Sequence, residues 1–269
     1  MPLPPIVEHW LLELTDAVFR RRIYPVPEPD RLRNCKIISH RGEHDNQVIL
    51  ENTMRAFEAA VEAGVWGIEL DIRWTRDSEP VVFHDGDLLR LYGTGDPIQA
   101  FTMDGLKHEF PSIVHLSEIV SRLGERVHLM IEIKQQAWPG PGEQSRRLQQ
   151  VLRPLSPVRD YHLLALQPRI LLPFSRFPPE TLVVVAEGWP AAHARWVLQN
   201  HWGGTCGHYL LMNRSILRKH HHIGRKIGTG YVRSRNCLFR ELNRGVDWIF
   251  SNDAGHLIKI MDALAKVSR

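Results

Sequence analysis

Short apolar runs alternate along the chain with stretches in which apolar residues recur every three or four positions. From residue 36 onward, the short runs have the length of buried strands and the stretches between them have helical periodicity. Alternation of this kind is typical of a parallel sheet. We predict strands at Lys36–Ser39, Gly67–Ile72, Pro80–Phe83, Val127–Ile133, Tyr161–Leu166, Thr181–Ala186, Thr205–Leu211, Lys226–Tyr231 and Asp247–Ser251.

These nine runs exceed by one the eight strands of a (β/α)₈ barrel, which usually takes about 250 residues. Only a short turn separates 80–83 from 67–72, so a crossover helix has no room there. We therefore predict an α/β fold, a (β/α)₈ TIM barrel in which 80–83 belongs to a loop after the second strand. A small insertion at about 85–126 follows that loop. Helices are predicted at 53–63, 143–153, 190–200, 214–221, 235–244 and 255–267.

The first 34 residues stand apart from this alternation. Residues 6–22 have apolar positions at helical spacing and end in three arginines, and a proline-rich link follows. We expect this N-terminal amphipathic helix to pack on the bottom of the barrel. Because basic amphipathic helices can lie on anionic lipid, the alternative is a membrane-surface or dimer contact. The chain thus divides into a helix and link at 1–34 and a barrel domain at 35–269.

Composition and charge say little about the fold but limit the kinds of binding partner. None of the apolar runs in the 269 residues approaches the roughly 20 needed to cross a bilayer, and the N-terminus lacks a signal-peptide pattern. Three cysteines without a C-x-x-C pair suggest reduced thiols and a cytoplasmic location. The net charge of +4 weakly favours anionic partners. Without a basic stripe interleaved with aromatic residues, we expect a small-molecule substrate and no nucleic acid.

Carboxylates interrupt two of the strand-like runs. Glu69 and Asp71 lie two residues apart and therefore face the same side of a strand, and Glu132 and Lys134 repeat this spacing. Burying unpaired charges costs several kcal/mol, so stability alone does not explain them. A divalent cation between the carboxylates would. Oxygen ligation by Glu69, Asp71 and Glu132 suits one hard cation, Mg²⁺ or Ca²⁺, rather than zinc.

Basic and titratable side chains accompany these carboxylates. Arg41 and Lys134 can hold a phosphate, and His40 and His84 can exchange protons near neutral pH. All of them fall at or near the carboxyl ends of predicted strands, or in the loop after the second strand, where barrels of this class place their chemistry. The pattern therefore predicts a metal-dependent phosphate-ester site.

Five motifs together resemble the glycerophosphodiester phosphodiesterase family. The resemblance is dense from about residue 37 to 134 and resumes at Gly245-Val246-Asp247. It implies hydrolysis of glycerophosphodiesters to an alcohol and sn-glycerol 3-phosphate. The motifs are His40-Arg41-Gly42, Glu51-Asn52-Thr53, Gly67-Ile68-Glu69-Leu70-Asp71, Val81-Val82-Phe83-His84-Asp85 and Ile131-Glu132-Ile133-Lys134.

The family chemistry needs a general acid and a general base. We expect His84 to protonate the leaving alcohol and His40 to remove a proton from the attacking oxygen. That oxygen belongs either to the substrate's own 2-hydroxyl, which would give a cyclic intermediate, or to water. Glu51 either orients a catalytic group or, with its two neighbours, only opens the first helix of the barrel.

A related activity is the alternative function: phospholipase-D-like hydrolysis of lysophospholipids or related lipid phosphodiesters. Trp138 and Trp189, just past predicted strand ends, could line an apolar groove for such substrates. A non-catalytic scaffold is disfavoured, because every expected carboxylate and histidine is present.

Near the eighth strand-like run the chain departs from the family. It has Gly230-Tyr231-Val232-Arg233 where the family usually has Trp-Thr-Val-Asn. We predict that Tyr231 lines the pocket and that the space at Gly230 admits a bulkier or more apolar group. Arg233 would add a positive charge if it faces the mouth. The alternative is that the Tyr231 ring simply replaces the lost volume.

Overall fold

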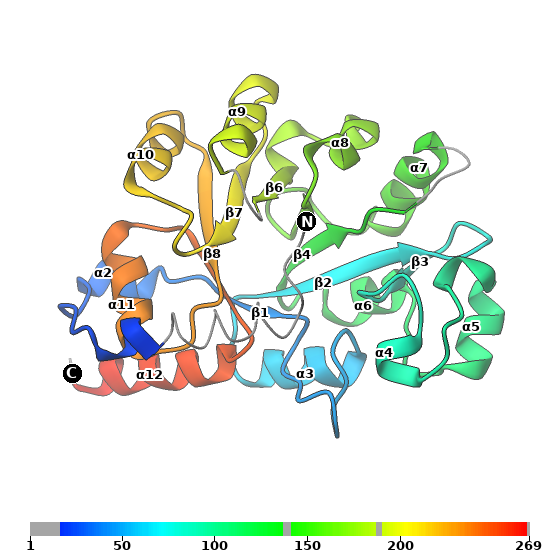
Figure 1. Ribbon diagram of the computed structural model, residues 1–269, viewed down its shortest axis with the longest axis horizontal. Coiled ribbons are helices and arrows are strands. Elements are labelled where there is room, and N and C mark those ends of the chain that lie inside the picture. Colours follow the sequence, from blue (N-terminus) through cyan, green and yellow to red (C-terminus); the bar gives the residue numbers. More distant parts are fainter. Residues whose placement is uncertain (1–16, 137–140, 187–189, 268–269) are drawn as a thin grey trace.

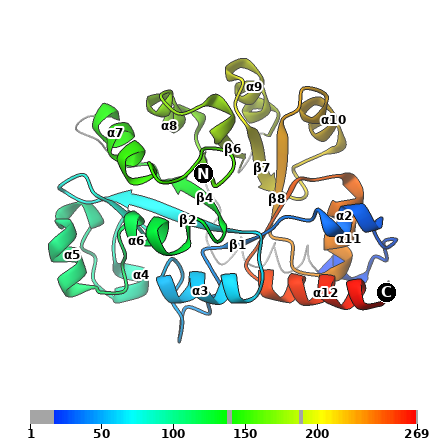
Figure 2. The same cartoon turned by 180° about the vertical axis from the view of Figure 1, so that it is seen from behind.

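A ring of parallel strands lies inside a layer of helices (Figure 1), and the view from behind shows the same arrangement (Figure 2). This computed structural model describes residues 17–136, 141–186 and 190–267. Pairing of β1 with β2 closes the ring, whose order is β1-β9-β8-β7-β6-β5-β4-β2. The strands are β1 (Ile37–His40), β2 (Gly67–Trp74), β3 (Pro80–Val82), β4 (His128–Ile133), β5 (Tyr161–Ala165), β6 (Leu182–Ala186), β7 (Gly204–His208), β8 (Lys226–Gly230) and β9 (Trp248–Ser251).

Most of the helices connect one strand of the ring to the next strand along the chain. Several begin at side-chain caps: Thr53 accepts the Ala56 N–H at the start of α3, and Ser234 accepts the Cys237 N–H at the start of α11. The helices are α2 (Pro29–Arg33), α3 (Met54–Glu62), α4 (Leu89–Tyr92), α5 (Met103–Glu109), α6 (Leu116–Leu123), α7 (Pro141–Val151), α8 (Pro168–Leu171), α9 (Pro190–Asn200), α10 (Arg214–His222), α11 (Arg235–Arg244) and α12 (Ala254–Val267).

The predicted TIM barrel is confirmed, including the exclusion of 80–83 from the ring. β3 is antiparallel to β2 and lies outside the closed barrel. The largest difference in a strand boundary is at the end of β7. The run at 205–211 is extended only as far as His208, because a turn begins there, with the Leu211 N–H donating to the His208 carbonyl at 2.9 Å.

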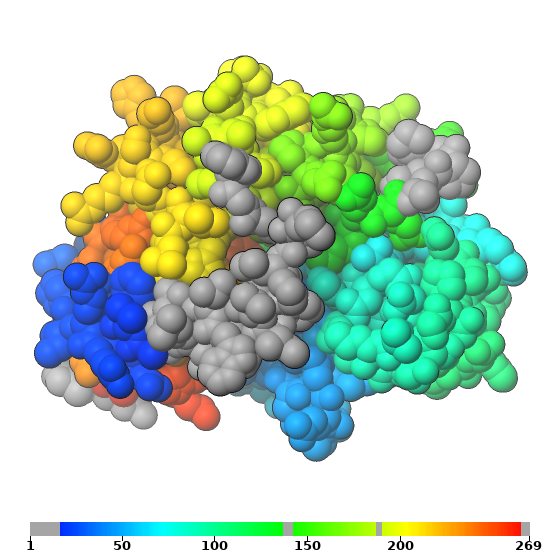
Figure 3. Space-filling model, in the orientation of Figure 1, coloured from blue at the N-terminus to red at the C-terminus, as the bar shows by residue number. Residues whose placement is uncertain are grey.

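The insertion after β3 has its own small hydrophobic core and forms one flank of the face in Figure 3, in cyan and green. The Val82 N–H donates to the Val114 carbonyl at 2.9 Å, which ties the start of the insertion to its end. The fully buried members of this core are Val81, Phe83, Leu88, Ile98, Leu106 and Ile113.

The described end of the predicted N-terminal helix lies beside the mouth of the barrel, whereas we expected this helix on the bottom. Residues 17–21 are helical. The Phe19 ring meets the Tyr209 ring edge-on at 5.3 Å, and the Arg240 guanidinium lies 4.7 Å from the Phe19 centroid. Tyr209 directly follows the carboxyl end of β7, so this contact lies at the mouth end of the barrel. The rest of the predicted helix lies outside the described residues. Among the described helices, none is both long and apolar enough to span a membrane.

The floor of the barrel contains two buried histidines that are hydrogen-bonded to each other. His128 Nδ1 donates to the Arg159 carbonyl at 2.9 Å, so its Nε2 accepts the proton of His162 Nδ1 at 2.8 Å. Trp66 stacks on the His128 ring at 4.3 Å, and Trp248 meets the His162 ring at 5.0 Å. Burial lowers the pKa of His128 to about 4, and burial with the neighbouring His128 lowers that of His162 to about 3.

We expect this pair to make the fold acid-sensitive. Both imidazoles are neutral in the folded state, whereas an unfolded histidine has a pKa near 6.5. Their contribution is therefore complete above about pH 6.5 and falls as the pH drops toward 4. His162→Asn keeps a donor for His128 without the titration. It should shrink the loss of unfolding free energy between pH 7 and 4.5, measured with urea, by about 2–3 kcal/mol. Equal losses in variant and wild type would contradict this.

Candidate active site

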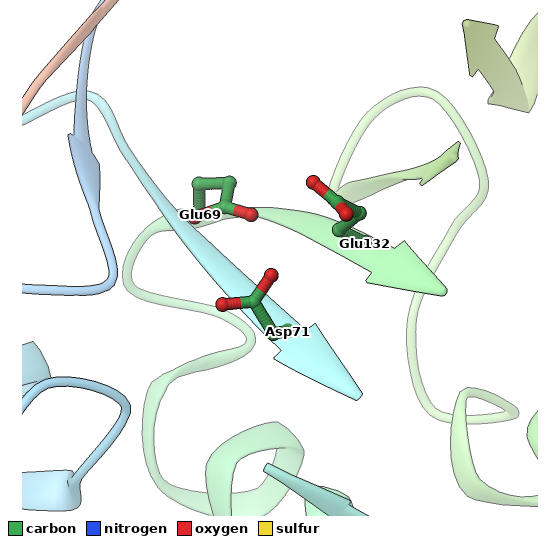
Figure 4. Close-up of side chains that lie close together, drawn as sticks. All are labelled: Glu69, Asp71 and Glu132. Atoms are coloured by element: carbon green, nitrogen blue, oxygen red, sulfur yellow. The ribbon is translucent and has the colours of Figure 1, made fainter. Parts of the chain in front are cut away.

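Three carboxylates converge at the carboxyl ends of β2 and β4. Glu69 and Asp71 lie two residues apart on β2, and Asp71 is in register with Glu132 on β4. One oxygen from each lies within 4.8 Å of the others. Figure 4 shows the three side chains directed toward a common space. All three are buried, and the structure brings together the three carboxylates that the sequence analysis proposed as cation ligands.

Glu69 is the carboxylate of the cluster whose oxygens receive no hydrogen bond from the described residues. Both its carboxylate oxygens are buried without a hydrogen-bond partner. Burial, together with Asp71 and Glu132, raises the pKa of Glu69 well above its ordinary range. A buried carboxylate that the described residues leave unsatisfied fits a cation ligand. The donor set contains only oxygen and suits a hard divalent cation.

Asp71 is held much more tightly than Glu69. Asn52 Nδ2 donates to its Oδ2 at 2.8 Å, and the Asp71 N–H donates to Asn52 Oδ1 at 3.1 Å. Arg41 Nε lies 3.1 Å from Oδ2, and Lys134 Nζ lies 2.8 Å from Oδ1. Burial opposes ionisation of Asp71, but these two cations outweigh it and lower its pKa. Asp71 is therefore fixed in position as an anion.

The two predicted phosphate ligands lie against the carboxylates. Lys134 Nζ bridges Asp71 and Glu132, at 2.5 Å from Glu132 Oε1. Arg41 joins Asp71 to Glu51, with Nη1 at 3.0 Å from Glu51 Oε1. The positive φ of Arg41, 61°, turns the chain sharply after β1 and brings its side chain back over the site.

His40 and His84 have chemically different partners. His40 Nδ1 lies 2.6 Å from the amide oxygen Asn252 Oδ1 and donates to it, which leaves Nε2 unprotonated in the neutral ring, 3.7 Å from Glu69 Oε2. Burial and Arg41 lower the pKa of His40 to about 3. His84 Nδ1 instead lies 2.8 Å from a carboxylate oxygen of Asp85. The hydrogen-bond partner of His40 is thus neutral, whereas that of His84 is a carboxylate.

Arg90, from the insertion, links both halves of the site and was not predicted. Its guanidinium binds both oxygens of Glu51, at 3.1 and 2.5 Å, and its Nε donates to Asp85 Oδ2 at 2.7 Å. A continuous chain of hydrogen bonds therefore runs from Arg41 through Glu51, Arg90 and Asp85 to His84. The Arg90 hydrogen bonds lower the pKa of Glu51 to about 2 against the effect of burial.

The Glu51-Asn52-Thr53 motif combines the two roles that the sequence left open. Thr53 caps α3, whereas Asn52 holds Asp71 and Glu51 holds the two arginines. Asn52 belongs to a motif that the sequence analysis named, but no role was assigned to it there. Asn252 had no signal beyond its place after a strand.

The predicted pocket residues are only partly placed. The Tyr231 ring lies 6.4 Å from the His40 ring, at the mouth. Arg233 Nε donates to Asp253 Oδ2 at 2.7 Å, so its charge is paired there. Trp138 and Trp189 lie outside the described residues.

Comparison with known proteins gives concordant matches. The model of the glycerophosphoryl diester phosphodiesterase family matches residues 40–182. A glycerophosphodiester phosphodiesterase of Bacillus altitudinis is 33% identical over 129 residues, which cover 43% of this chain and 52% of that protein. The chain thus matches about half the length of this relative. A human lysophospholipase D is 48% identical over 58 residues, covering 22% of this chain and 18% of the relative.

A solved structure supports the fold. The phosphodiesterase of Oleispira antarctica, determined in complex with the product sn-glycerol-3-phosphate, superimposes with a TM-score of 0.72 at 21% identity. The match covers 84% of this chain and 96% of that one. At this level of identity the likeness establishes the barrel.

Proposed function

Because the chain belongs to the glycerophosphoryl diester phosphodiesterase family, whose model matches residues 40–182, we propose that it hydrolyses glycerophosphodiesters to an alcohol and sn-glycerol 3-phosphate. The observation that carries this proposal is the buried cluster of Glu69, Asp71 and Glu132, with two histidines and two cations around it. Nothing in the packing of a barrel requires three carboxylates at this point.

The three carboxylates and the two basic side chains have different roles toward the phosphate. Glu69, Asp71 and Glu132 would hold one divalent cation, Mg²⁺ or Ca²⁺, which supplies charge stabilisation at a phosphate oxygen. Arg41 and Lys134, now 3.1 and 2.8 Å from Asp71, would bind the remaining phosphate oxygens. These contacts orient the diester and offset the charge that grows in the transition state.

We assign one histidine as the general base and the other as the general acid. Burial keeps His40 a neutral imidazole, and its Nε2, left unprotonated by the hydrogen bond from Nδ1 to Asn252, accepts a proton from the attacking hydroxyl or water. His84, whose Nδ1 is held by the Asp85 carboxylate, takes the role of the acid that protonates the leaving alkoxide.

A product analysis tests this function. The purified protein should be incubated with glycerophosphocholine and with lysophosphatidylcholine in the presence of Mg²⁺ or Ca²⁺, and the products identified by mass spectrometry. We expect choline and sn-glycerol 3-phosphate from the first substrate. Faster release of choline from lysophosphatidylcholine would favour the second candidate, a lysophospholipid hydrolase. The match to the human lysophospholipase D supports that candidate. Absence of turnover on both substrates would overturn the proposal.

Arg90→Ala should lower kcat about 10-fold, because Asp85 and Glu51 lose the guanidinium that bridges them. Arg90→Lys should not restore the rate, because an ammonium cannot bind both Glu51 oxygens and reach Asp85. Lys107→Ala is the matched control, since it removes an exposed ion pair with Glu118 in the same insertion. If Arg90 acts through His84, the loss shrinks on a diester with an acidic leaving group. An equal loss in the Lys107 variant would refute the positioning role.

A further inference from the structure

Arg73 lies on the same strand as two of the proposed cation ligands, and the proposed chemistry does not use it. Side chains alternate along a strand, so Arg73 faces the same side of β2 as Glu69 and Asp71, two residues nearer the mouth than Asp71. The pairing of β2 with β4 ends one residue earlier, at Ile72. Arg73 therefore lies where the barrel strands end and the loops of the mouth begin.

The Arg73 guanidinium joins the loops that follow β3 and β4. Its Nε donates to the main-chain carbonyl of His84 at 2.8 Å, and its Nη1 donates to the main-chain carbonyl of Gln135 at 3.1 Å. A Cβ added to Gly86 would lie 4.0 Å from Nη1, so the loop after His84 passes beside the guanidinium. One side chain thus holds two walls of the mouth together.

Packing alone does not account for a guanidinium at this position. Arg73 is partly buried, and among the described residues it bonds to neutral carbonyls and forms no ion pair with a carboxylate. Burial lowers the pKa of Arg73, and the charges of Asp71 and Asp85 oppose this shift. Withdrawing a cation from water for bonds to neutral groups is costly. The planar fork of donors is suited to fixing two acceptors at once.

The backbone of His84 is fixed to β2 on both sides of the residue. The Phe83 N–H donates to the Asp71 carbonyl at 2.9 Å, and the His84 carbonyl accepts from Arg73. The imidazole has a separate anchor, because its Nδ1 is held by Asp85. The proposed acid is therefore tied, through its own main chain, to the strand that carries two of the proposed cation ligands.

The second carbonyl connects Arg73 to the phosphate-binding side of the site. Gln135 directly follows Lys134, whose N–H donates to the Ile72 carbonyl at 3.2 Å. The hydrogen bond from Arg73 to Gln135 adds a second tie between β2 and this loop. Arg73 therefore sets the His84 carbonyl at a fixed place relative to the loop that carries Lys134.

We propose that Arg73 is a positioning residue for His84: by binding two main-chain carbonyls, it holds the proposed general acid at a fixed distance from the phosphate beside Lys134. This inference rests on the proposed function. Arg73 does not touch the substrate or transfer a proton. Its loss lets the His84 loop shift, and protonation of the leaving oxygen slows, because a displacement of about 1 Å can cost about 100-fold in rate. Binding of the phosphate by the cation and by Arg41 and Lys134 is retained.

The dependence of the rate on the leaving group tests this role. Arg73→Met keeps the apolar stem of the side chain and removes its donors. For glycerophosphocholine it should lower kcat about 10- to 100-fold and change KM by less than about threefold. On a glycerol nitrophenyl phosphodiester, whose leaving group needs no protonation, the loss should shrink to less than about threefold. Arg73→Lys keeps the charge without the planar fork and should show the same pattern.

Arg31→Met is the matched control for these substitutions. Arg31 Nη1 also donates to a main-chain carbonyl, that of Leu242 in α11. This hydrogen bond has no connection to the His84 loop, so Arg31→Met should leave the rates on both substrates unchanged.

A double substitution separates the positioning of His84 from a general effect on the fold. In the His84→Ala background, Arg73→Met should lower kcat for glycerophosphocholine by less than about threefold, because no acid remains to be misplaced. A full loss in that background, or equal losses on the two substrates, would overturn the inference. Thermal unfolding shows whether each variant is folded, and if Arg73→Met is not, Arg73→Lys provides both comparisons. If the wild type hydrolyses neither diester, the proposed function fails instead.

Discussion

Glu69→Gln is expected to abolish hydrolysis of glycerophosphocholine, by at least about 10²–10³-fold, and to leave the cation-free protein at least as stable as the wild type. The buried Glu69 oxygens have no hydrogen-bond partner among the described residues, and burial together with the neighbouring carboxylates raises the pKa of Glu69. Removing the charge therefore relieves repulsion while it removes a cation ligand. Initial rates, calorimetric titration with Mg²⁺ or Ca²⁺ and thermal unfolding in EDTA measure the three effects.

Asp71→Asn is the matched control, because the two carboxylates differ in their partners. Asp71 pairs with Arg41 and Lys134, and its loss leaves both cations buried near Glu132 with less compensation. Breaking a buried ion pair from one side typically costs about 3–5 kcal/mol. We therefore expect Asp71→Asn to lose both activity and stability. If Glu69→Gln destabilised the cation-free protein as much as Asp71→Asn does, the proposed electrostatics of the cluster would be wrong.

His40→Ala and His84→Ala should each lower kcat about 10²–10⁴-fold, with smaller changes in KM. The two variants are separated by a substrate whose leaving group is already acidic, such as a nitrophenyl phosphodiester. Such a group leaves without protonation, so the variant that lacks the general acid should recover much of its rate. The partners of the histidines assign that role to His84.

Asp85→Asn sharpens this assignment. It keeps a hydrogen-bond partner for His84 Nδ1 but removes the carboxylate that stabilises the imidazolium. We expect a smaller loss than in His84→Ala and the same recovery with the acidic leaving group. Recovery in His40→Ala instead would reverse the assignment of acid and base.

Most of the barrel could be predicted from the sequence because its strands are buried runs separated by helices with caps. The strand predicted at 67–72 forms and continues to Trp74, and the two-residue spacing of Glu69 and Asp71 places both on the same side of it. β7 was predicted less well. Its apolar run continues past His208, but Tyr209 lies outside the strand and packs against Phe19. An apolar residue in a loop and one in a strand look the same in a sequence.

The parts of the site that were missed are held together by tertiary contacts. Asn252 lies 212 positions from His40, and Arg90 lies 39 positions from Glu51. No periodicity links such residues, and only the closure of the ring and the docking of the insertion bring them together.

The most direct test of a cation-dependent diester hydrolase is phosphorus NMR of one sample of the wild-type protein with glycerophosphocholine. In EDTA we expect the diester signal to persist. After addition of excess Mg²⁺ or Ca²⁺, it should be replaced by the signal of sn-glycerol 3-phosphate. Conversion at the same rate in EDTA would contradict the role of Glu69, Asp71 and Glu132 as cation ligands. Appearance of phosphocholine in place of sn-glycerol 3-phosphate would contradict the bond that the site is proposed to cleave.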